Sequence, residues 1–244
     1  MFCFLFMTEK YDKKYFKNIS KDVGIIYKKH RPTKNFWTIF IRKYKSSGRL
    51  LDIGCGQGFF LEYAEKYYET YGMDISKYAI KDARNKTYTT KYILMDVTKL
   101  GFKDNSFDII TCFDVLEHLK NPKSTLQDIY RMLRRKGILA MTVPNLNSIG
   151  LKLKQERWFG YRDTTHISLL TNKEWLIMLE KCGFNIIKVF YDGLWDSPYF
   201  NYIPSFIQHL IFKIPSTILL SIGIKFPQKY GENLCVIAKK IAKK

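Results

Sequence analysis

The chain has 244 residues, of which 46% are hydrophobic and 16% aromatic; this is enough to bury a core and excludes an intrinsically disordered chain. Its formal net charge of +19 is compatible with an acidic partner such as nucleic acid or an anionic membrane. Most of the 41 basic residues are lysines spread along the chain, so we favour a lysine-rich composition over nucleic-acid binding as the origin of the charge.

Five cysteines are scattered without the spacing of a zinc or redox motif, which predicts structural thiols in a reducing, cytoplasmic compartment. The apolar residues 1–7 have no basic flank and are shorter than the core of a signal peptide, so we expect no targeting signal there. Two alternatives stay open for this segment: a small membrane anchor, or a true start at Met7 rather than Met1.

The hydrophobic pattern and the turn residues predict alternating elements along the chain. In order, these are helix 25–45, strand 49–53, helix 59–68, strand 71–75, helix 77–85, strand 92–97, strand 107–113, helix 122–134, strand 137–143, helix 171–181, strand 184–190 and strand 233–239. Thr171 and Glu174 have the spacing of a capping box, and Gly183 closes that helix. The alternation predicts a doubly wound parallel sheet with right-handed crossovers and helices on both faces.

These pieces account for nearly the whole chain, so we expect one domain over residues 1–244. Residues 1–48 would form an N-terminal helical cap, residues 49–190 and 233–240 the core, and residues 191–232 an apolar insertion between the last two strands.

Gly54, Gly56 and Gly58 directly follow the first predicted strand and open a helix. Glycines let a backbone turn tightly and approach a ligand, and a helix N-terminus offers free N–H groups. Asp74 ends the second strand, where an acid can accept hydrogen bonds from the ribose hydroxyls of a nucleoside, and Asp96 ends the third. Because ligands of such sheets bind beyond the carboxyl ends of the strands, these residues predict a nucleoside site there.

Several motifs in sequence order resemble those of one family. The stretch LLDIGCGQG (50–58) resembles the first motif of class I S-adenosylmethionine-dependent methyltransferases, GMDIS (72–76) their second and MDV (95–97) their third. The stretch LGFKDNSFDII (100–110) resembles the approach to their fourth strand. FDVLEHL (113–119) is similar to a segment of the small-molecule subgroup related to ubiquinone-biosynthesis methyltransferases.

The resemblance implies a Rossmann-like, doubly wound, mostly parallel seven-stranded sheet, an N-terminal helical segment, and S-adenosyl-L-methionine as cofactor. It also implies a set of cofactor-binding residues: Asp52, Gly54, Cys55, Gly56, Gly58, Asp74, Ile75, Asp96, Val97 and Phe113. The glycines would pack on the methionine part, and Asp52 would orient the loop or the ammonium group. Asp74 would hold the ribose, Asp96 and the Val97 backbone the adenine, and Phe113 would lie near the sulfonium.

A dehydrogenase is the natural competitor for a glycine loop followed by an acid. Its dinucleotide fingerprint has the pattern G-x-G-x-x-G, which would place a glycine at the position of Phe59. The loop of this chain therefore favours a zwitterionic amino-acid tail over a pyrophosphate.

Methyl transfer requires an aligned acceptor, the exclusion of water and, for a hydroxyl or amine, a base. The candidates are His166, Asp163 and His118. Residues 158–166 resemble a D-x-T-H stretch that lies over the active site in relatives, where Asp163 could orient His166 for proton removal. Alternatively, Asp163 and His166 only hold the loop in place.

Glu117 and His118 could cap the next helix. We expect no metal site.

Residues 197–227 contain two apolar runs, 203–213 and 214–224, each too short to span a bilayer. One interpretation is a helical hairpin that dips into a membrane interface and places a cytoplasmic protein peripherally at the inner face of the membrane. The other interpretation is a helical cap over the substrate pocket or a contact between two copies.

We therefore expect methyl transfer to an oxygen or nitrogen atom of a small-molecule, glycan or lipid-linked acceptor. One alternative is an RNA methyltransferase, which the net charge favours. Against it, residues 114–117 (DVLE) stand where a base-amino methyltransferase would carry an Asn-Pro-Pro-Tyr-type segment. A second alternative is a non-catalytic cofactor-binding protein of the same fold.

Overall fold

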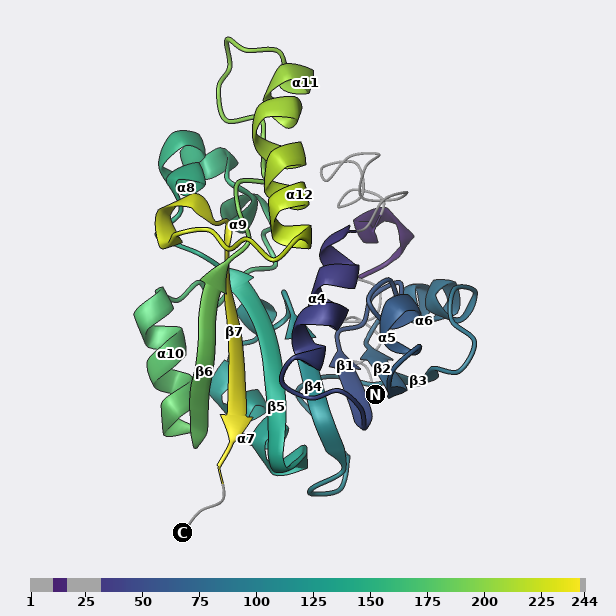
Figure 1. Cartoon of the computed structure of the whole chain (residues 1–244). Helices are drawn as coiled ribbons and strands as arrows, with labels where there is room; N and C mark the ends of the chain where they lie inside the picture. The colour runs from purple at the N-terminus through teal and green to yellow at the C-terminus, as the bar shows by residue number, and fades with distance from the viewer. Residues whose placement is uncertain (1–10, 17–31, 242–244) are drawn as a thin grey trace.

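The computed structural model describes residues 11–16 and 32–241, and Figure 1 shows their arrangement. The apolar residues 1–7 and the first part of the helix expected within 25–45 lie outside the described residues. The described part of that helix is α4 (Pro32–Arg42).

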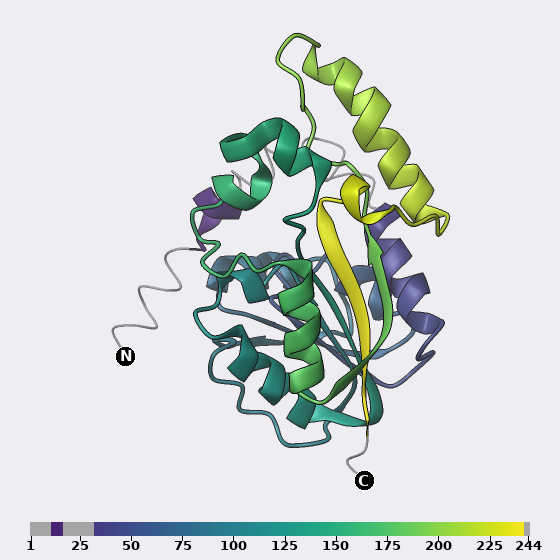
Figure 2. The same ribbon diagram turned by 90° about the vertical axis from the view of Figure 1, so that its left-hand side faces the viewer.

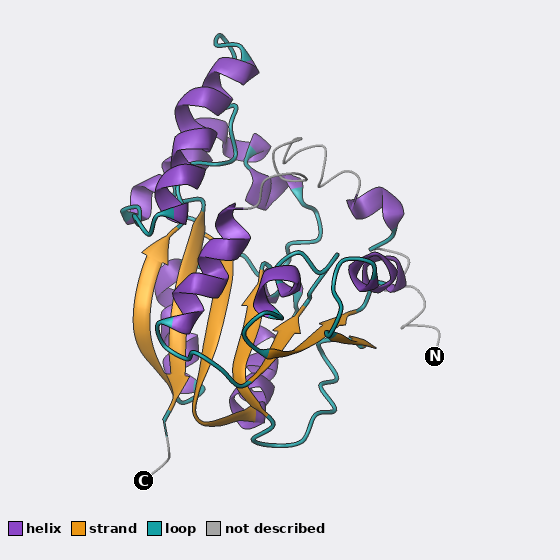
Figure 3. Ribbon diagram, turned by 45° about the vertical axis from the view of Figure 1, so that its right-hand side comes forward, coloured by secondary structure: helices purple, strands orange, loops and turns teal. Residues whose placement is uncertain are grey.

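A seven-stranded sheet forms the centre of the fold, with strand order β3-β2-β1-β4-β5-β7-β6 (Figure 3). Its strands are β1 (Arg49–Ile53), β2 (Glu69–Asp74), β3 (Lys91–Leu94), β4 (Phe107–Phe113), β5 (Leu133–Pro144), β6 (Phe184–Tyr191) and β7 (Asn233–Lys240). The first five strands are parallel, whereas β7 runs antiparallel to both of its neighbours. The predicted doubly wound, mostly parallel seven-stranded sheet is confirmed.

Helices cover both faces of the sheet because successive strand residues point to opposite sides. Leu51 and Ile110 pack on one face, together with α7 (Pro122–Met132) and α10 (Asn172–Lys181). Their sequence neighbours Leu50 and Ile109 pack on the other face, with α4 and two shorter helices. These two helices are α5 (Leu61–Ala64) and α6 (Lys77–Arg84). Figure 2 shows α7 and α10 side by side on their face.

Short helical segments lie beyond the carboxyl ends of the parallel strands. After β4 comes η1 (Leu116–His118), and after β5 come α8 (Ile149–Lys154), η2 (Gln155–Arg157) and α9 (Phe159–Arg162). The insertion between β6 and β7 holds α11 (Ser205–Gln208), η3 (His209–Lys213), α12 (Ile214–Ser221) and η4 (Gln228–Tyr230).

Three predicted boundaries are corrected. The helix expected over 59–68 is reduced to α5, since the chain turns after Ala64 and buries Tyr68, whose hydroxyl donates to the Lys45 carbonyl (2.7 Å). α7 ends at Met132 rather than at residue 134, because Leu133 already pairs with Phe107 in the sheet. β3 ends at Leu94, so that Asp96 lies in the turn after it.

The helical hairpin, one of the two interpretations of residues 197–227, does not form. α11, η3 and α12 follow one another with right-handed helical dihedral angles at each junction, so residues 205–221 form one continuous helix. The segment η3 is a π-helical turn, and Pro215 lies in the first turn of α12. A proline inside a regular α-helix clashes with the carbonyl four residues earlier, and the wider π turn just before Pro215 relieves that constraint.

A buried carboxylate fastens the insertion to the carboxyl end of the sheet. Glu232 accepts hydrogen bonds from Trp158 Nε1 (2.6 Å), Ser148 Oγ (3.0 Å) and the hydroxyl of Tyr199. Burial raises the pKa of Glu232, and the three donors counteract this effect by favouring its charged form. Trp158 is fully buried in this network, which makes it a core residue.

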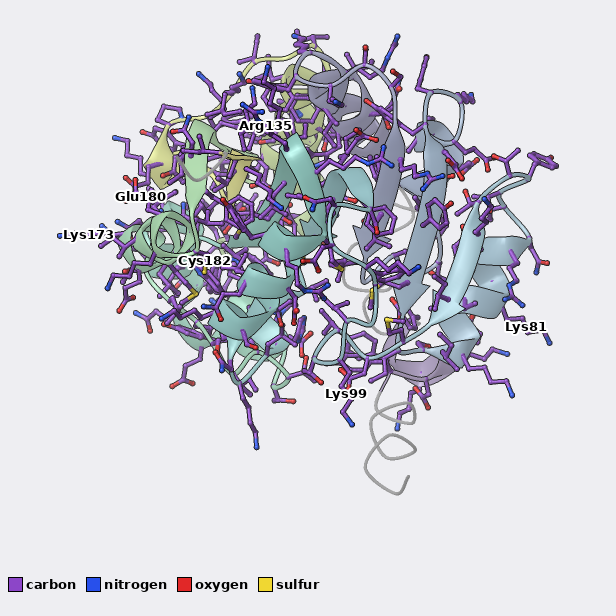
Figure 4. The ribbon with its side chains drawn as sticks, turned by 90° about the horizontal axis from the view of Figure 1, so that it is seen from below. Lys81, Lys99, Arg135, Lys173, Glu180 and Cys182 are labelled. Atoms are coloured by element: carbon purple, nitrogen blue, oxygen red, sulfur yellow. The ribbon has the colours of Figure 1, made fainter. Side chains whose placement is uncertain are left out.

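The positive charge of the chain is dispersed over the surface. Lys81 on α6, Lys99 after β3, Arg135 in β5 and Lys173 on α10 are all exposed, and Lys81 and Lys173 lie on opposite sides of the molecule (Figure 4). Within residues 11–16 and 32–241, no helix has the length and apolarity needed to cross a bilayer.

The predicted capping box at the start of α10 is confirmed. The Thr171 side chain accepts from the Glu174 amide, and the Glu174 carboxylate accepts from the Thr171 amide (2.7 Å). Both interactions satisfy backbone groups that the first helical turn would otherwise leave open.

We predict that Thr171→Ala lowers the free energy of unfolding by about 1 kcal/mol, because an N-cap oxygen is lost. The thermal midpoint should fall by roughly 2–4 °C, as expected for a chain of this size. Thr171→Ser keeps the oxygen and should melt near the unsubstituted protein. An unchanged midpoint in the alanine variant would contradict a stabilising role of this cap.

Candidate active site

The glycine loop between β1 and α5 depends on three left-handed residues. Gly54, Gly56 and Gly58 have φ angles of +69°, +51° and +74°, which residues with a side chain rarely adopt. At Gly58, an added Cβ would lie 2.8 Å from the Cβ of Ala83, so α6 leaves no room for a larger residue there. Among the described residues, a Cβ at Gly56 would meet only the ring of Phe16, at 3.8 Å. The loop therefore has no side chain at these three positions, and only its backbone can face a ligand there.

Asp74, the last residue of β2, ties this loop to the sheet. Its carboxylate accepts from the Gly56 amide (2.8 Å) and from the Ser76 amide (2.8 Å). Burial raises the pKa of Asp74, while these backbone hydrogen bonds oppose the shift. A second link joins the Cys55 amide to the Met73 carbonyl (2.9 Å).

Two further acids lie at the carboxyl end of the sheet. Asp52 in β1 is buried and accepts a hydrogen bond from Thr111 Oγ1 on β4 (2.7 Å). Asp96 follows β3 and accepts from both the amide and the hydroxyl of Thr98 (2.8 Å each). Each carboxylate is thus oriented by a neighbouring threonine.

The other residues expected to bind the cofactor lie around the same edge. Cys55 is buried and packs with the cluster that contains Phe60, and burial raises the pKa of its thiol well above the usual range. Phe113 ends β4, and its ring lies 4.6 Å from that of Trp37 on α4. Ile75 and Val97 are half-buried and directly follow Asp74 and Asp96.

Residues 11–16 lie against the glycine loop and contact both sides of the site. The Tyr11 carbonyl accepts from Ser76 Oγ (2.5 Å), and the Phe16 ring lies beside Gly56. The Tyr15 hydroxyl donates to Asp163 Oδ2 (3.2 Å). Sequence reasoning missed these residues; the only signal was the tyrosine-rich composition of the segment.

The structure brings the three candidate catalytic residues together. Thr165 Oγ1 donates to Asp163 Oδ1 (2.5 Å) and lies 2.7 Å from His118 Nδ1. A hydroxyl has one proton, so the second contact requires His118 Nδ1–H to donate to Thr165. The rings of His118 and His166 contact each other, with centroids 4.6 Å apart. The sequence did not identify Thr165 as the link.

His166 has a buried side chain of defined orientation. Its Nδ1 lies 2.8 Å from the Gly160 carbonyl, which can only accept, so Nδ1 carries a proton and Nε2 is the nitrogen at which the neutral ring has its lone pair. Nε2 lies 3.9 Å from Asp163 Oδ2 and 4.0 Å from Glu117 Oε1. For Asp163, burial alone would raise the pKa, but hydrogen bonds from Thr165 and the nearby histidines outweigh it and lower the pKa.

Glu117 is the unusual member of this group. Its side chain is 1% exposed, and neither carboxyl oxygen has a hydrogen-bond partner among the described residues. Burial raises the pKa of Glu117 well above its ordinary value, which favours the neutral acid. Its backbone carbonyl instead accepts from the amides of Ile167 and Ser168 (2.9 Å each) and so holds the 163–168 segment in place.

Glu117, His118 and His166 offer ligand atoms that all lie within 4.8 Å of one another, a grouping that could hold a metal ion. The sequence predicted no metal site, because the two histidines are far apart in the chain and meet only through the fold.

The chain matches the family model described as "Methyltransferase domain" over residues 27–189. Two uncharacterized proteins of Methanocaldococcus jannaschii are 31% and 30% identical to it, over 74% and 91% of this chain and 80% and 81% of those proteins. A ubiquinone biosynthesis O-methyltransferase of Alkalilimnicola ehrlichii is 32% identical over 41% of this chain and 42% of that enzyme.

Solved structures show the same fold. A SAM-dependent methyltransferase from Archaeoglobus fulgidus superposes with a TM-score of 0.66, covering 94% of this chain and all of that one, at 22% identity. The family match, the sheet order and the glycine loop followed by Asp74 agree with one another. The chain therefore belongs to the class I S-adenosylmethionine-dependent methyltransferases, which take S-adenosylmethionine as their methyl donor.

Proposed function

We propose that this methyltransferase methylates an oxygen or nitrogen atom of a small-molecule, glycan or lipid-linked acceptor, with His166 as the base. The observation that carries the proposal is the position of His166 Nε2 between Asp163 and Glu117. This cluster adjoins the glycine loop, since Val115 between β4 and η1 packs against Gly54.

The cofactor would lie along the carboxyl edge of β1 to β4. We propose that the loop backbone at Gly54, Gly56 and Gly58 holds its amino-acid part, with Asp52 and Cys55 beneath. We assign the ribose to Asp74 and Ile75, the adenine to Asp96 and Val97, and the region of the sulfonium to Phe113. The absence of a side chain at Gly56 and the buried carboxylate of Asp74 support this assignment. When bound, S-adenosylmethionine supplies an electrophilic methyl group.

His166 would accept the proton of the acceptor at Nε2. Its Nδ1–H remains on the Gly160 carbonyl, so the ring becomes an imidazolium while keeping its orientation. Asp163 stays ionised because its pKa is lowered, and its Oδ2 balances the new charge. His118 donates to Thr165, and Thr165 in turn donates to the other oxygen of Asp163 and fixes it.

Residues 11–16 would exclude water from the reaction. Burial raises the pKa of Tyr11 and of Tyr15, so both phenols stay neutral at physiological pH. A neutral Tyr15 donates to Asp163 and covers that side of the cluster. Exclusion of water strengthens the electrostatic interaction between Asp163 and the imidazolium.

The relatives support methylation of an oxygen atom. Besides the ubiquinone biosynthesis enzyme, a malonyl-[acyl-carrier protein] O-methyltransferase of Enterobacter lignolyticus is 26% identical over 52% of this chain and 50% of that enzyme. Both names describe O-methylation; where the oxygen belongs to a hydroxyl group, a base such as His166 assists the transfer by removing its proton.

We predict that S-adenosylhomocysteine at about 100 times its dissociation constant stabilises the protein by about 2.7 kcal/mol and raises the thermal midpoint by several degrees. Asp74→Ala should abolish this rise because the ribose acceptor and the anchor of Gly56 are both lost. The surface variant Asp104→Ala should keep it. A rise with NAD, or a full rise in Asp74→Ala, would contradict the assignment.

We predict that His166→Asn lowers kcat by roughly 10²–10⁴-fold, the usual contribution of a general base, and leaves S-adenosylhomocysteine binding intact. The assay would transfer a radiolabelled methyl group to a panel of phenols, catechols and amines, with bulk tRNA included. The same substitution at His209, on the insertion helix, is the matched control and should leave kcat unchanged. Equal activity of both variants would remove His166 from the mechanism, and methylation of tRNA alone would favour the RNA alternative.

We predict that treatment with a chelator leaves activity unchanged, since the proposed base needs no metal. Glu117→Gln should also remain active, because the amide imitates the neutral carboxylic acid that burial favours. A different result would show that Glu117, His118 and His166 act as metal ligands. In that case the chelator would abolish activity, a divalent cation would restore it, and Glu117→Gln would be inactive.

A further inference from the structure

The helix at 205–221 buries mainly polar side chains and exposes mainly apolar ones. Among its described side chains, the buried ones are Gln208, Lys213, Ser216 and, near the end, Leu220, so three are polar and one is apolar. Its exposed face is formed by large apolar side chains. Together with one residue before the helix and one after it, we call these side chains the apolar ridge. The ridge consists of Tyr202, Phe206, Leu210, Ile211, Ile218 and Ile222, each at least 54% exposed. A helix on the surface of a protein in water has the opposite arrangement.

Specific hydrogen bonds hold the polar face inward. Gln208 accepts from the amides of Tyr199 (2.6 Å) and Phe200 (2.9 Å) and donates to two carbonyls. Ser216 Oγ accepts from the Leu194 amide (3.1 Å). The outward orientation of the ridge is therefore fixed by the fold.

The π turn η3 keeps this orientation along the whole helix. Gln208 and Lys213 are five residues apart, a spacing that places two side chains on different faces of a regular α-helix. A π-helical turn takes up the additional residue, so both side chains are buried. Without it, the second half of the helix would turn part of the ridge toward the protein.

The charge around the ridge indicates what covers it. Residues 197–231 contain no aspartate or glutamate; Lys229 is exposed and Lys225 half-buried there, and the whole chain carries +19. A second copy of this chain would bring the same positive charge, which opposes association. An anionic lipid surface offers both an apolar interior for the ridge and attraction for the lysines.

The ridge is accessible to a flat surface. The helix projects away from the sheet beyond its carboxyl edge (Figures 1 and 2), and its 17 residues span about 25 Å. This length suits a helix that lies in the plane of the interface. Exposed apolar patches of this extent mark interaction sites.

We propose that the apolar ridge is a docking surface for an anionic membrane, on which the protein lies peripherally with the helix 205–221 in the interface. The ridge side chains enter the boundary between headgroups and acyl chains, and the dispersed lysines strengthen binding to negatively charged headgroups. Binding does not depend on the identity of the methyl acceptor.

The test is flotation of the full chain with vesicles of phosphatidylcholine, alone or mixed with phosphatidylglycerol. We expect binding to the mixed vesicles that weakens with salt, and much weaker binding to the neutral ones. The variant with Phe206→Gln, Leu210→Gln and Ile211→Gln should lose about tenfold in partitioning for each side chain removed. The matched control substitutes Tyr88, Ile177 and Ile187, which are exposed apolar residues elsewhere, with Gln and should bind like the unsubstituted chain.

A second readout keeps the test independent of folding effects. Phe206→Trp should show a blue-shifted emission on addition of mixed vesicles, and all variants should retain their thermal midpoints. The proposal is overturned if the chain does not float with mixed vesicles at low salt, or if the ridge and control variants bind alike. It is also overturned if the ridge variant only abolishes a dimer seen by sedimentation, since the occupant would then be a second copy.

Discussion

The hydrogen bond from the Gly56 amide to the buried carboxylate of Asp74 (2.8 Å) is the interaction on which the glycine loop, the proposed cofactor site, depends. It joins the loop after β1 to the end of β2, so the glycine backbone is held in a left-handed path that the sheet itself does not enforce. Because Asp74 is buried, its charge is compensated mainly by backbone amides at this edge. The same carboxylate that would face a ribose therefore also shapes the loop that would face the methionine part.

The acceptor half depends on a different kind of restraint. Glu117 and His118 come directly after β4, whereas Asp163, Thr165 and His166 come after β5 and its short helices. Backbone bonds from the 167–168 amides to the Glu117 carbonyl bring the two segments together. Neighbouring parallel strands thus deliver side chains from distant parts of the sequence to one place, which is why the carboxyl edge of such a sheet can host a base and its partner.

The sequence located the glycine loop and the acids at the carboxyl edge well, because their signals are local. The glycines follow a buried strand, the acids follow the next two, and the bounds of β1 and β4 agree with the expected ones. The acceptor half was predicted only as separate residues, since nothing local links His118 to Thr165. The sequence left a hairpin and a cap both open for the insertion, because Pro215 resembles a helix break and a π turn that relieves the clash leaves no clear pattern in the sequence.

Residues 11–16 have a consequence for the order of events during turnover. The segment bonds to Ser76 on the cofactor side and to Asp163 on the acceptor side. With the ligands bound as proposed, one displacement of this segment would uncover both of them, and neither would be closed to water while the other exchanges. Loading of the two substrates and departure of the two products would then share a single opening step. The rate of that step would set an upper limit on turnover that is independent of the methyl transfer itself.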